Sequence, residues 1–344
     1  MFIMNSGSFK LLPTTLSAFS QVFILVDENT LLHCYPLVKL ALPQHILIQI
    51  QSGEENKTLA TCTLVWDELT KHNADRDSVL INLGGGVIGD LGGFAAGCYK
   101  RGIKFINIPT TLLAMVDASV GAKTGIDFNG FKNQIGLFNE AEAIFINTTF
   151  LKTLPERELL SGFAEVLKHY LIAGPIAFKR LLNELPQLST LNWNEEVEQN
   201  VNIKSLIVEK DPLEQSNRKA LNFGHTIGHA VESYFLNNSA EKLLHGEAVA
   251  IGLICESYLS QKSGFLTSED LSAVTRVVLH YFKLPAIPEN SFANLLKLIK
   301  QDKKSSLGKN RFTLLQGIGN YSINNSVEET EIIESLKYYN HQRA

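Results

Sequence analysis

The feature that most constrains the fold is a glycine cluster that directly follows an apolar run. The run Ser78–Leu83 (SVLINL) is typical of a buried strand, and the letters GGGVIGD come straight after it. Gly84, Gly86 and Gly89 have the spacing G-x-G-x-x-G between a strand and a helix start. A backbone without Cβ atoms can approach a diphosphate there, and the N–H groups of the first helical turn can bind it. The alternative is a tight turn that only packs a helix onto a strand.

This turn departs from the usual dinucleotide-binding plan in two ways. It follows a late strand instead of the first, and no acidic residue lies about 20 positions on to hold a ribose. Asp27, at the end of the first apolar run, is the candidate for that role instead.

Short apolar runs alternate with helical patterns through the first half of the chain, which predicts a parallel sheet covered on both faces. The expected strands are Val22–Asp27, His45–Gln51, Ser78–Leu83, Phe105–Ile108 and Ala143–Ile146, with a helix over Lys57–His72. Beyond about residue 155 the pattern becomes helical. The expected helices are Ser161–Ile172, Ile176–Leu185, Asn194–Lys210, Leu221–Phe235, Gly246–Ser263, Ser268–Tyr281 and Val327–Tyr339, with a short strand at Arg311–Gln316. We therefore predict a Rossmann-like α/β domain over 1–155 and a mostly α-helical domain over 156–344.

Composition excludes several classes of protein. The 344 residues carry a net charge of −4 without a block of basic residues, which argues against nucleic-acid binding. No run reaches about 18 apolar residues, so no membrane span is expected, and the N-terminal MFIMNSGSFK does not resemble a secretory signal. Cys34, Cys62, Cys98 and Cys255 are widely spaced, which predicts buried thiols in a reducing compartment. We expect a cytoplasmic protein that acts on a small molecule.

Three histidines and a glutamate form the most informative pattern. His225 and His229 in NFGHTIGHAVE are four residues apart, so on a helix they share one face. His245 opens the next helical stretch, and Glu165 lies in the amphipathic segment GFAEVLK. Two imidazoles, a carboxylate and an open position make a catalytic zinc set. A lone histidine is more often a core residue, but three of them with flanking glycines favour a site.

Two further groups of polar residues could bind an anion. Loops rich in glycine suit a phosphate or a carboxylate when they also carry lysines. One such region contains Asp117, Lys123, Lys132 and Asn133, and the alternative for it is an ordinary solvated loop. A second group, Lys204, Arg218 and Asn222, could direct two cations and an amide at one pocket. Of the two cations, arginine suits a carboxylate better, because its planar guanidinium can donate two parallel hydrogen bonds. The alternative for this group is a charged and solvated helix face.

Taken together, these motifs resemble the 3-dehydroquinate synthase family of sugar phosphate cyclases. The likeness extends over residues 80–310 and is weaker before residue 75 and at the C-terminus. The segments that carry it are GGGVIGDLGGF, YKRGI, IPTTLLAMVDASVGAKTGID, GFKNQIG, GFAEVLK, LNFGHTIGHAVE, LHGEAVAIG and DKK. One departure is Ala122, where the family usually has glycine.

The resemblance implies a role for each matching position. The metal ligands, for zinc or cobalt, would be Glu165, His225 and His245, and His229 would shuttle a proton beside them. Residues that touch the substrate would be Asp117, Lys123, Lys132, Asn133, Lys168, Lys204, Glu214, Arg218, Asn222 and Lys304, with Arg101 reaching the phosphate in the neighbouring subunit. The positions that match NAD+ contacts are Asp27, Asn29, Glu54, Lys57, Gly85, Gly86, Asp90, Thr110, Thr111, Lys123, Lys132, Thr153 and Leu154.

The implied activity is the conversion of 3-deoxy-D-arabino-heptulosonate 7-phosphate to 3-dehydroquinate and phosphate. It would proceed through transient oxidation by NAD+, β-elimination of phosphate, re-reduction and an intramolecular aldol closure, in a homodimer. The alternatives are a cyclase of sedoheptulose 7-phosphate, a metal-dependent polyol dehydrogenase and a silent nucleotide-binding protein. The first would not need Lys204 and Arg218 as a carboxylate clamp, the second would not need the phosphate loop, and the third predicts broken metal ligands.

Overall fold

The chain divides into two compact units. The computed structural model describes residues 2–4, 8–129, 131–238, 242–302 and 311–343. The first unit comprises Met1–Leu159 and Trp193–Val201, and the second comprises Leu160–Asn192 and Asn202–Ala344.

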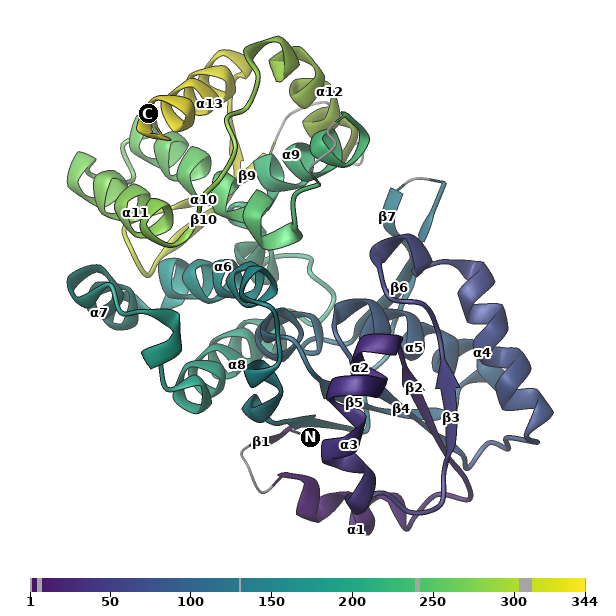
Figure 1. Cartoon of the computed structure of the whole chain (residues 1–344). Coiled ribbons are helices and arrows are strands. Elements are labelled where there is room, and N and C mark those ends of the chain that lie inside the picture. Colours follow the sequence, from purple (N-terminus) through teal and green to yellow (C-terminus); the bar gives the residue numbers. More distant parts are fainter. Residues whose placement is uncertain (1, 5–7, 130, 239–241, 303–310, 344) are drawn as a thin grey trace. The chain divides into compact units, whose positions relative to one another are not determined.

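The first unit is built on a six-stranded parallel sheet, which confirms the predicted α/β class (Figure 1). Its order is β1-β8-β5-β4-β2-β3. The strands are β1 Phe2–Met4, β2 Val22–Val26, β3 Ile46–Gln49, β4 Val79–Gly84, β5 Lys104–Pro109 and β8 Ala143–Ile146. Every residue of β2 and β4 is buried, as expected for central strands covered on both faces.

The helices of this unit are α1 Leu12–Leu16, α2 Glu28–His33, α3 Tyr35–Val38, α4 Leu59–Lys71 and α5 Gly86–Cys98. Helices α4 and α5 cover one face of the sheet, where Phe23, Leu25 and Leu80 pack against Val65 and Leu91. They connect β3 to β4 and β4 to β5, moving in one direction across the sheet. The α2–α3 connection from β2 to β3 runs the opposite way, and right-handed crossovers therefore place it on the other face. The carboxyl ends of β2 and β4 thus form a topological switch point, the usual ligand site of such sheets.

The second unit is mostly helical, as predicted. Its helices are α6 Glu156–Ala173, α7 Pro175–Glu184, the latter part of α8 Trp193–Lys210, α9 His225–Asn238, α10 His245–Lys262, α11 Ser268–Tyr281, α12 Phe292–Asp302 and α13 Glu329–Arg343. An antiparallel pair, β9 Arg311–Leu315 and β10 Tyr321–Ser326, completes it. The central helix is α10, which packs against α9, α11, α13 and β9, and most of its side chains are buried.

Several elements differ from the sequence prediction. The region expected as a cationic loop is partly an antiparallel pair, β6 Lys123–Phe128 and β7 Phe131–Phe138, and β7 is almost wholly exposed. Strands β1 and β10 and helices α1, α2, α3 and α12 were not predicted. The prediction of four buried thiols is wrong for Cys98, which is exposed at the end of α5. Across the described ranges, no helix is both long and apolar enough to span a membrane.

Candidate functional site

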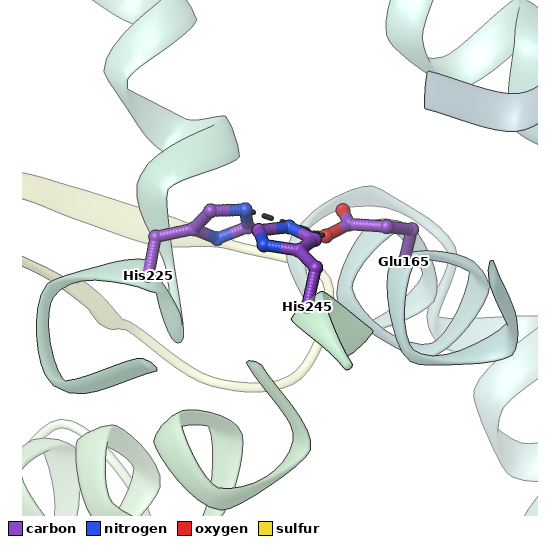
Figure 2. Close-up of side chains that lie close together, drawn as sticks. All are labelled: Glu165, His225 and His245. Atoms are coloured by element: carbon purple, nitrogen blue, oxygen red, sulfur yellow. Dashed lines mark ion pairs between the residues drawn. The ribbon is translucent and has the colours of Figure 1, made fainter. Parts of the chain in front are cut away.

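Three side chains from three helices converge in the helical unit (Figure 2). Glu165 Oε1 of α6 lies 3.3 Å from His225 Nε2 and 3.4 Å from His245 Nε2. One ligand atom from each residue lies within 4.8 Å of the others. One carboxylate oxygen and two imidazole nitrogens, with a further position left open, are a donor set that fits a catalytic Zn²⁺ and equally a Co²⁺. The residues present therefore fit the metal that the sequence resemblance implies.

Close packing of glycines brings these helices together. A Cβ atom at Gly246 would lie 1.9 Å from the backbone oxygen of Ser161, so only glycine lets α10 begin against α6. The Gly246 N–H also donates to Ser161 Oγ at 3.0 Å. Farther along α10, a Cβ at Gly252 would lie 1.8 Å from the oxygen of Gly224, just before α9. His245 and His225, each the first residue of its helix, are positioned by these two approaches.

Two buried glutamates that the sequence prediction did not include support the histidines. Glu256 of α10 accepts hydrogen bonds from the backbone N–H groups of Gly224 at 2.7 Å and Ile227 at 2.9 Å, and so caps the start of α9. Glu232 Oε2 lies 3.2 Å from His245 Nδ1. Glu232 was within the quoted motif NFGHTIGHAVE, and its spacing from His229 was the signal available for finding it.

The two histidines of the donor set have opposite protonation tendencies. Burial lowers the pKa of His225 to about 4, although Glu165 acts in the opposite direction. Burial also lowers the pKa of His245, but Glu232 and Glu165 outweigh it and raise that pKa to about 10. Since a ligating imidazole must be neutral at the coordinating nitrogen, metal binding at this set would release a proton from His245.

His229 lies beside the donor set. Its ring centroid is 5.2 Å from that of His225 and 5.9 Å from that of His245. This position suits the expected proton shuttle, which stays a prediction.

The helical unit also buries three of the cations expected to bind the substrate. Lys168, Lys204 and Arg218 are 1%, 5% and 3% exposed. Lys168 forms an ion pair with Glu165. A buried cation is stable only where an anion or hydrogen bonds compensate for it, as this carboxylate does for Lys168 and the Pro212 carbonyl oxygen does for Arg218.

A short loop organises the remaining predicted residues of this unit. Asp211 accepts hydrogen bonds from the backbone N–H groups of Gln215, Ser216 and Arg218 at 2.7–3.0 Å. These bonds outweigh burial and hold the pKa of the Asp211 carboxyl below its usual value. Within the loop, the Asn222 amide donates to Glu214 Oε1 at 2.9 Å. The structure thus brings Glu214 and Asn222 into contact, while the Arg218 guanidinium of the same loop donates to the Pro212 carbonyl oxygen at 2.6 Å.

The glycine turn of the first unit lines a hollow between the carboxyl ends of β4 and β5. Its lining comprises Asn82, Gly84, Gly85, Gly86, Gly89, Asn107, Pro109, Ala114, Ala118 and Ser119. A Cβ at Gly89 would meet nothing within 4 Å, and one at Gly86 only the Ala118 methyl at 3.6 Å. The N-cap of the 13-residue α5 is Gly85, which supplies no capping side chain, so its first-turn N–H groups suit a diphosphate. Thr110 and Thr111 follow the adjacent strand β5.

Lys57 connects this turn to the β6–β7 pair. Its ammonium group, on a side chain that is 4% exposed, donates to Asp90 Oδ2 at 2.6 Å and to Asn133 Oδ1 at 2.5 Å. Burial lowers the pKa of Lys57, but Asp90 and Glu54 outweigh it, so the pKa is raised. Glu54 Oε1 also lies 3.6 Å from Lys132 Nζ. Five of the predicted contact residues are therefore linked in one network.

The remaining predicted residues occupy the following positions in their elements. Asp27 caps α2 by accepting the Thr30 N–H at 2.7 Å, with the exposed Asn29 in the same helix. Asp117 lies in a π-helical turn at Ala114–Ala118, and Lys123 begins β6. Exposed positions are occupied by Arg101 and Thr153, with Leu154 half-buried, and Lys304 is outside the described residues.

Ala122, the departure from the family pattern, has a φ of 62°. This is the left-handed region, in which glycine is favoured because a Cβ atom costs about 1–2 kcal/mol. A glycine, which the sequence resemblance leads us to expect at this position, would adopt this conformation without that cost.

Comparison with known proteins agrees with this architecture. The pattern of the 3-dehydroquinate synthase N-terminal domain matches residues 47–161, and that of the C-terminal domain matches residues 162–305. A 3-dehydroquinate synthase of Parabacteroides distasonis is 44% identical over 327 residues, which are 93% of this chain and 92% of that protein.

Two solved structures of related cyclases have the same fold. One is 2-epi-5-epi-valiolone synthase from Streptomyces hygroscopicus subsp. jinggangensis with NAD+ and Zn²⁺ bound, which has a TM-score of 0.86 and 28% identity over 96% of this chain and 95% of that one. The other is 2-deoxy-scyllo-inosose synthase with carbaglucose-6-phosphate, NAD+ and Co²⁺, with a TM-score of 0.82 and 25% identity over 95% and 94%. The chain belongs to the 3-dehydroquinate synthase family.

Proposed function

We propose that this protein is a 3-dehydroquinate synthase, which converts 3-deoxy-D-arabino-heptulosonate 7-phosphate to 3-dehydroquinate and phosphate. The observation that carries the proposal is the Glu165, His225 and His245 donor set, in a helical unit that also buries Lys168, Lys204 and Arg218. A metal centre combined with buried cations suits an anionic polyol. The identity to 3-dehydroquinate synthases over most of the chain supports the same substrate.

The overall reaction is a redox-neutral elimination of phosphate with formation of a carbocycle, so it consumes no net oxidant. When bound, NAD+ would supply a reversible hydride acceptor, and Zn²⁺ or Co²⁺ would supply a Lewis acid at the hydroxyl oxygen of the carbinol carbon that is oxidised. Glu165, His225 and His245 would hold the cation, and the glycine turn with Asp90 and Thr111 would hold the dinucleotide.

The protein's own side chains would orient the substrate and move its protons. In the helical unit, Lys204 and Arg218 would bind the carboxylate, and His229 would take and return the hydroxyl proton. In the α/β unit, Lys123 and Lys132 would bind phosphate and stabilise its departure as negative charge develops.

We propose the remaining contacts to substrate and NAD+ from the sequence resemblance in the same way. They would comprise Asp117, Asn133, Lys168, Glu214, Asn222, Arg101 and Lys304 for the substrate, and Asp27, Asn29, Glu54, Lys57, Gly85, Gly86, Thr110, Thr153 and Leu154 for NAD+. We further propose that the enzyme works in the cytoplasm as a homodimer, with its α/β domain over 1–155 binding the dinucleotide and its helical domain over 156–344 binding the metal.

A sister cyclase is the second candidate, because the two solved relatives are named as synthases of other products, 2-epi-5-epi-valiolone and 2-deoxy-scyllo-inosose. Turnover of 3-deoxy-D-arabino-heptulosonate 7-phosphate and of sedoheptulose 7-phosphate, measured separately with the same enzyme, discriminates between them. We expect a kcat/KM at least ~100-fold higher for the first substrate. A substrate without a carboxylate would leave the buried cations that bind this group unpaired, which costs a few kcal/mol. A higher kcat/KM for sedoheptulose 7-phosphate would instead identify the protein as a sister cyclase.

A further inference from the structure

Helix α9 carries three polar side chains along one face, although only two of them have a place in the proposed reaction. His225, His229 and Glu232 are spaced by four and three residues, which places them on the same side of a helix. Glu232 is buried, with 6% of its surface exposed. A carboxylate is costly to bury unless hydrogen bonds or a charge compensate for it, so its partner indicates its use.

One of the partners of Glu232 is His245, a predicted metal ligand on another helix. Glu232 Oε2 lies 3.2 Å from His245 Nδ1, while His245 Nε2 lies 3.4 Å from Glu165 Oε1. One ring nitrogen therefore faces the donor set, and the other faces Glu232.

The two histidines of the donor set are oriented differently. His225 Nδ1 lies 3.1 Å from the carbonyl oxygen of Phe223, two residues earlier in the chain, so local backbone fixes that ring. The His245 side chain is more exposed, at 27% against 11% for His225, and its Nδ1 contact comes from α9. Without Glu232, rotation of the His245 ring would be less restricted.

We propose that Glu232 is a positioning residue of the metal centre, whose carboxylate accepts the Nδ1–H of His245 and so directs the lone pair of Nε2 toward the cation. The inference rests on the proposed function, since it requires a cation at Glu165, His225 and His245. Such an acceptor fixes the tautomer and the ring orientation of a ligating histidine and raises its basicity.

The test measures metal affinity directly instead of turnover. Glu232→Gln keeps the length of the side chain and an acceptor oxygen but removes the charge, and Glu232→Ala removes the acceptor. The matched control is Glu334→Gln, because Glu334 is also a bonded carboxylate of the helical unit but contacts Tyr258 and Lys262 instead of a histidine. Zn²⁺ and Co²⁺ affinities are measured by competition with a chelator, together with the visible spectrum of the Co²⁺ protein and the thermal midpoint of the metal-free protein.

We expect metal affinity to fall ~10-fold in Glu232→Gln and up to ~100-fold in Glu232→Ala, the range found for such outer partners. The Co²⁺ absorption bands should shift in both variants, while the metal-free Glu232→Gln protein keeps its thermal midpoint. Wild-type affinity and an unchanged Co²⁺ spectrum in both variants would overturn the inference, as would a loss of thermal stability without a loss of affinity. If Glu232→Ala does not fold, Glu232→Gln decides alone. Failure of the wild type to bind either metal would refute the proposed metal centre itself.

Discussion

Gly246→Ala places a methyl group where α10 begins against α6. The added Cβ would lie 1.9 Å from the backbone oxygen of Ser161, and it would also lie 2.5 Å from the carbonyl carbon of that residue. Backbone atoms cannot move aside as the end of a flexible side chain can. To restore a separation of 3.0 Å, α10 must therefore withdraw from α6 by at least 1.1 Å.

This displacement acts directly on the donor set, because His245 precedes Gly246 and Glu165 is four residues beyond Ser161. Metal–ligand distances tolerate deviations of about ±0.2 Å, several times less than the required movement. We expect Gly246→Ala to bind Zn²⁺ nearly as weakly as His245→Ala does. Overpacking should also lower the free energy of unfolding by about 1–3 kcal/mol.

The assay combines chelator competition for Zn²⁺ with denaturant unfolding of the metal-free protein. Gly89→Ala is the control for both measurements, since its Cβ meets nothing within 4 Å and it lies in the α/β unit. The control should keep its metal affinity and lose no stability. If Gly246→Ala bound Zn²⁺ like the wild type and unfolded at the same denaturant concentration, close packing of α10 on α6 would not position His245.

Three further substitutions test other parts of the site. His225→Ala should lose bound metal and turnover together, since it removes one of three proposed protein ligands, whereas substitution of the exposed His280 by Ala should preserve both. The measurement is metal analysis of the purified variants. An unchanged metal content in His225→Ala would remove His225 from the ligand set. Arg218→Ala should lower the affinity for the sugar phosphate by ~10–100-fold, the contribution of hydrogen bonds to a charged group, and change the affinity for NAD+ little. Both affinities are measured by calorimetric titration, with Arg276→Ala as the surface control. An equal loss of affinity for both ligands would contradict a carboxylate role. Lys57→Met should weaken the binding of both NAD+ and the sugar phosphate and lower the free energy of unfolding by about 3 kcal/mol, because it breaks a buried ion pair that links the glycine turn to the β6–β7 pair. A loss of affinity for only one of the two ligands would refute this linkage.

The sequence predicted the sheet well because its central strands are buried and mostly apolar. Strands β2, β4 and β8 are buried at every residue, and their sequences are apolar apart from Asn82 and the terminal Gly84 of β4. Strand β7 lacks such a buried run, since its side chains are almost all exposed and it pairs with β6 in a two-stranded sheet. Strand β1 has three residues, too few to show a period. Helix α12 could have been predicted, because Phe292, Leu295, Leu296 and Ile299 have helical spacing and all are buried.

The grouping of the candidate donor set was predictable from the sequence, but the contacts that support it were not. Histidines spaced by four residues indicate one helical face, and the geometry of the helical unit brings His225 and His245 to Glu165. The supporting contacts of Glu232 and Glu256 cross between α9 and α10. Spacing could place Glu232 on the same face of α9 as His225 and His229, but it cannot show that His245 of another helix contacts it, so the contacts themselves required the three-dimensional structure.

The account's central claim is tested most directly by phosphate release from 3-deoxy-D-arabino-heptulosonate 7-phosphate, recorded together with absorbance at the NADH band. With NAD+ and Zn²⁺ or Co²⁺ present, we predict many equivalents of phosphate per enzyme and no net NADH. Omitting NAD+ from cofactor-free enzyme, or removing the metal with a chelator, should abolish the release. NADH that accumulates in step with turnover, or an absence of phosphate from this substrate under all these conditions, would contradict the account.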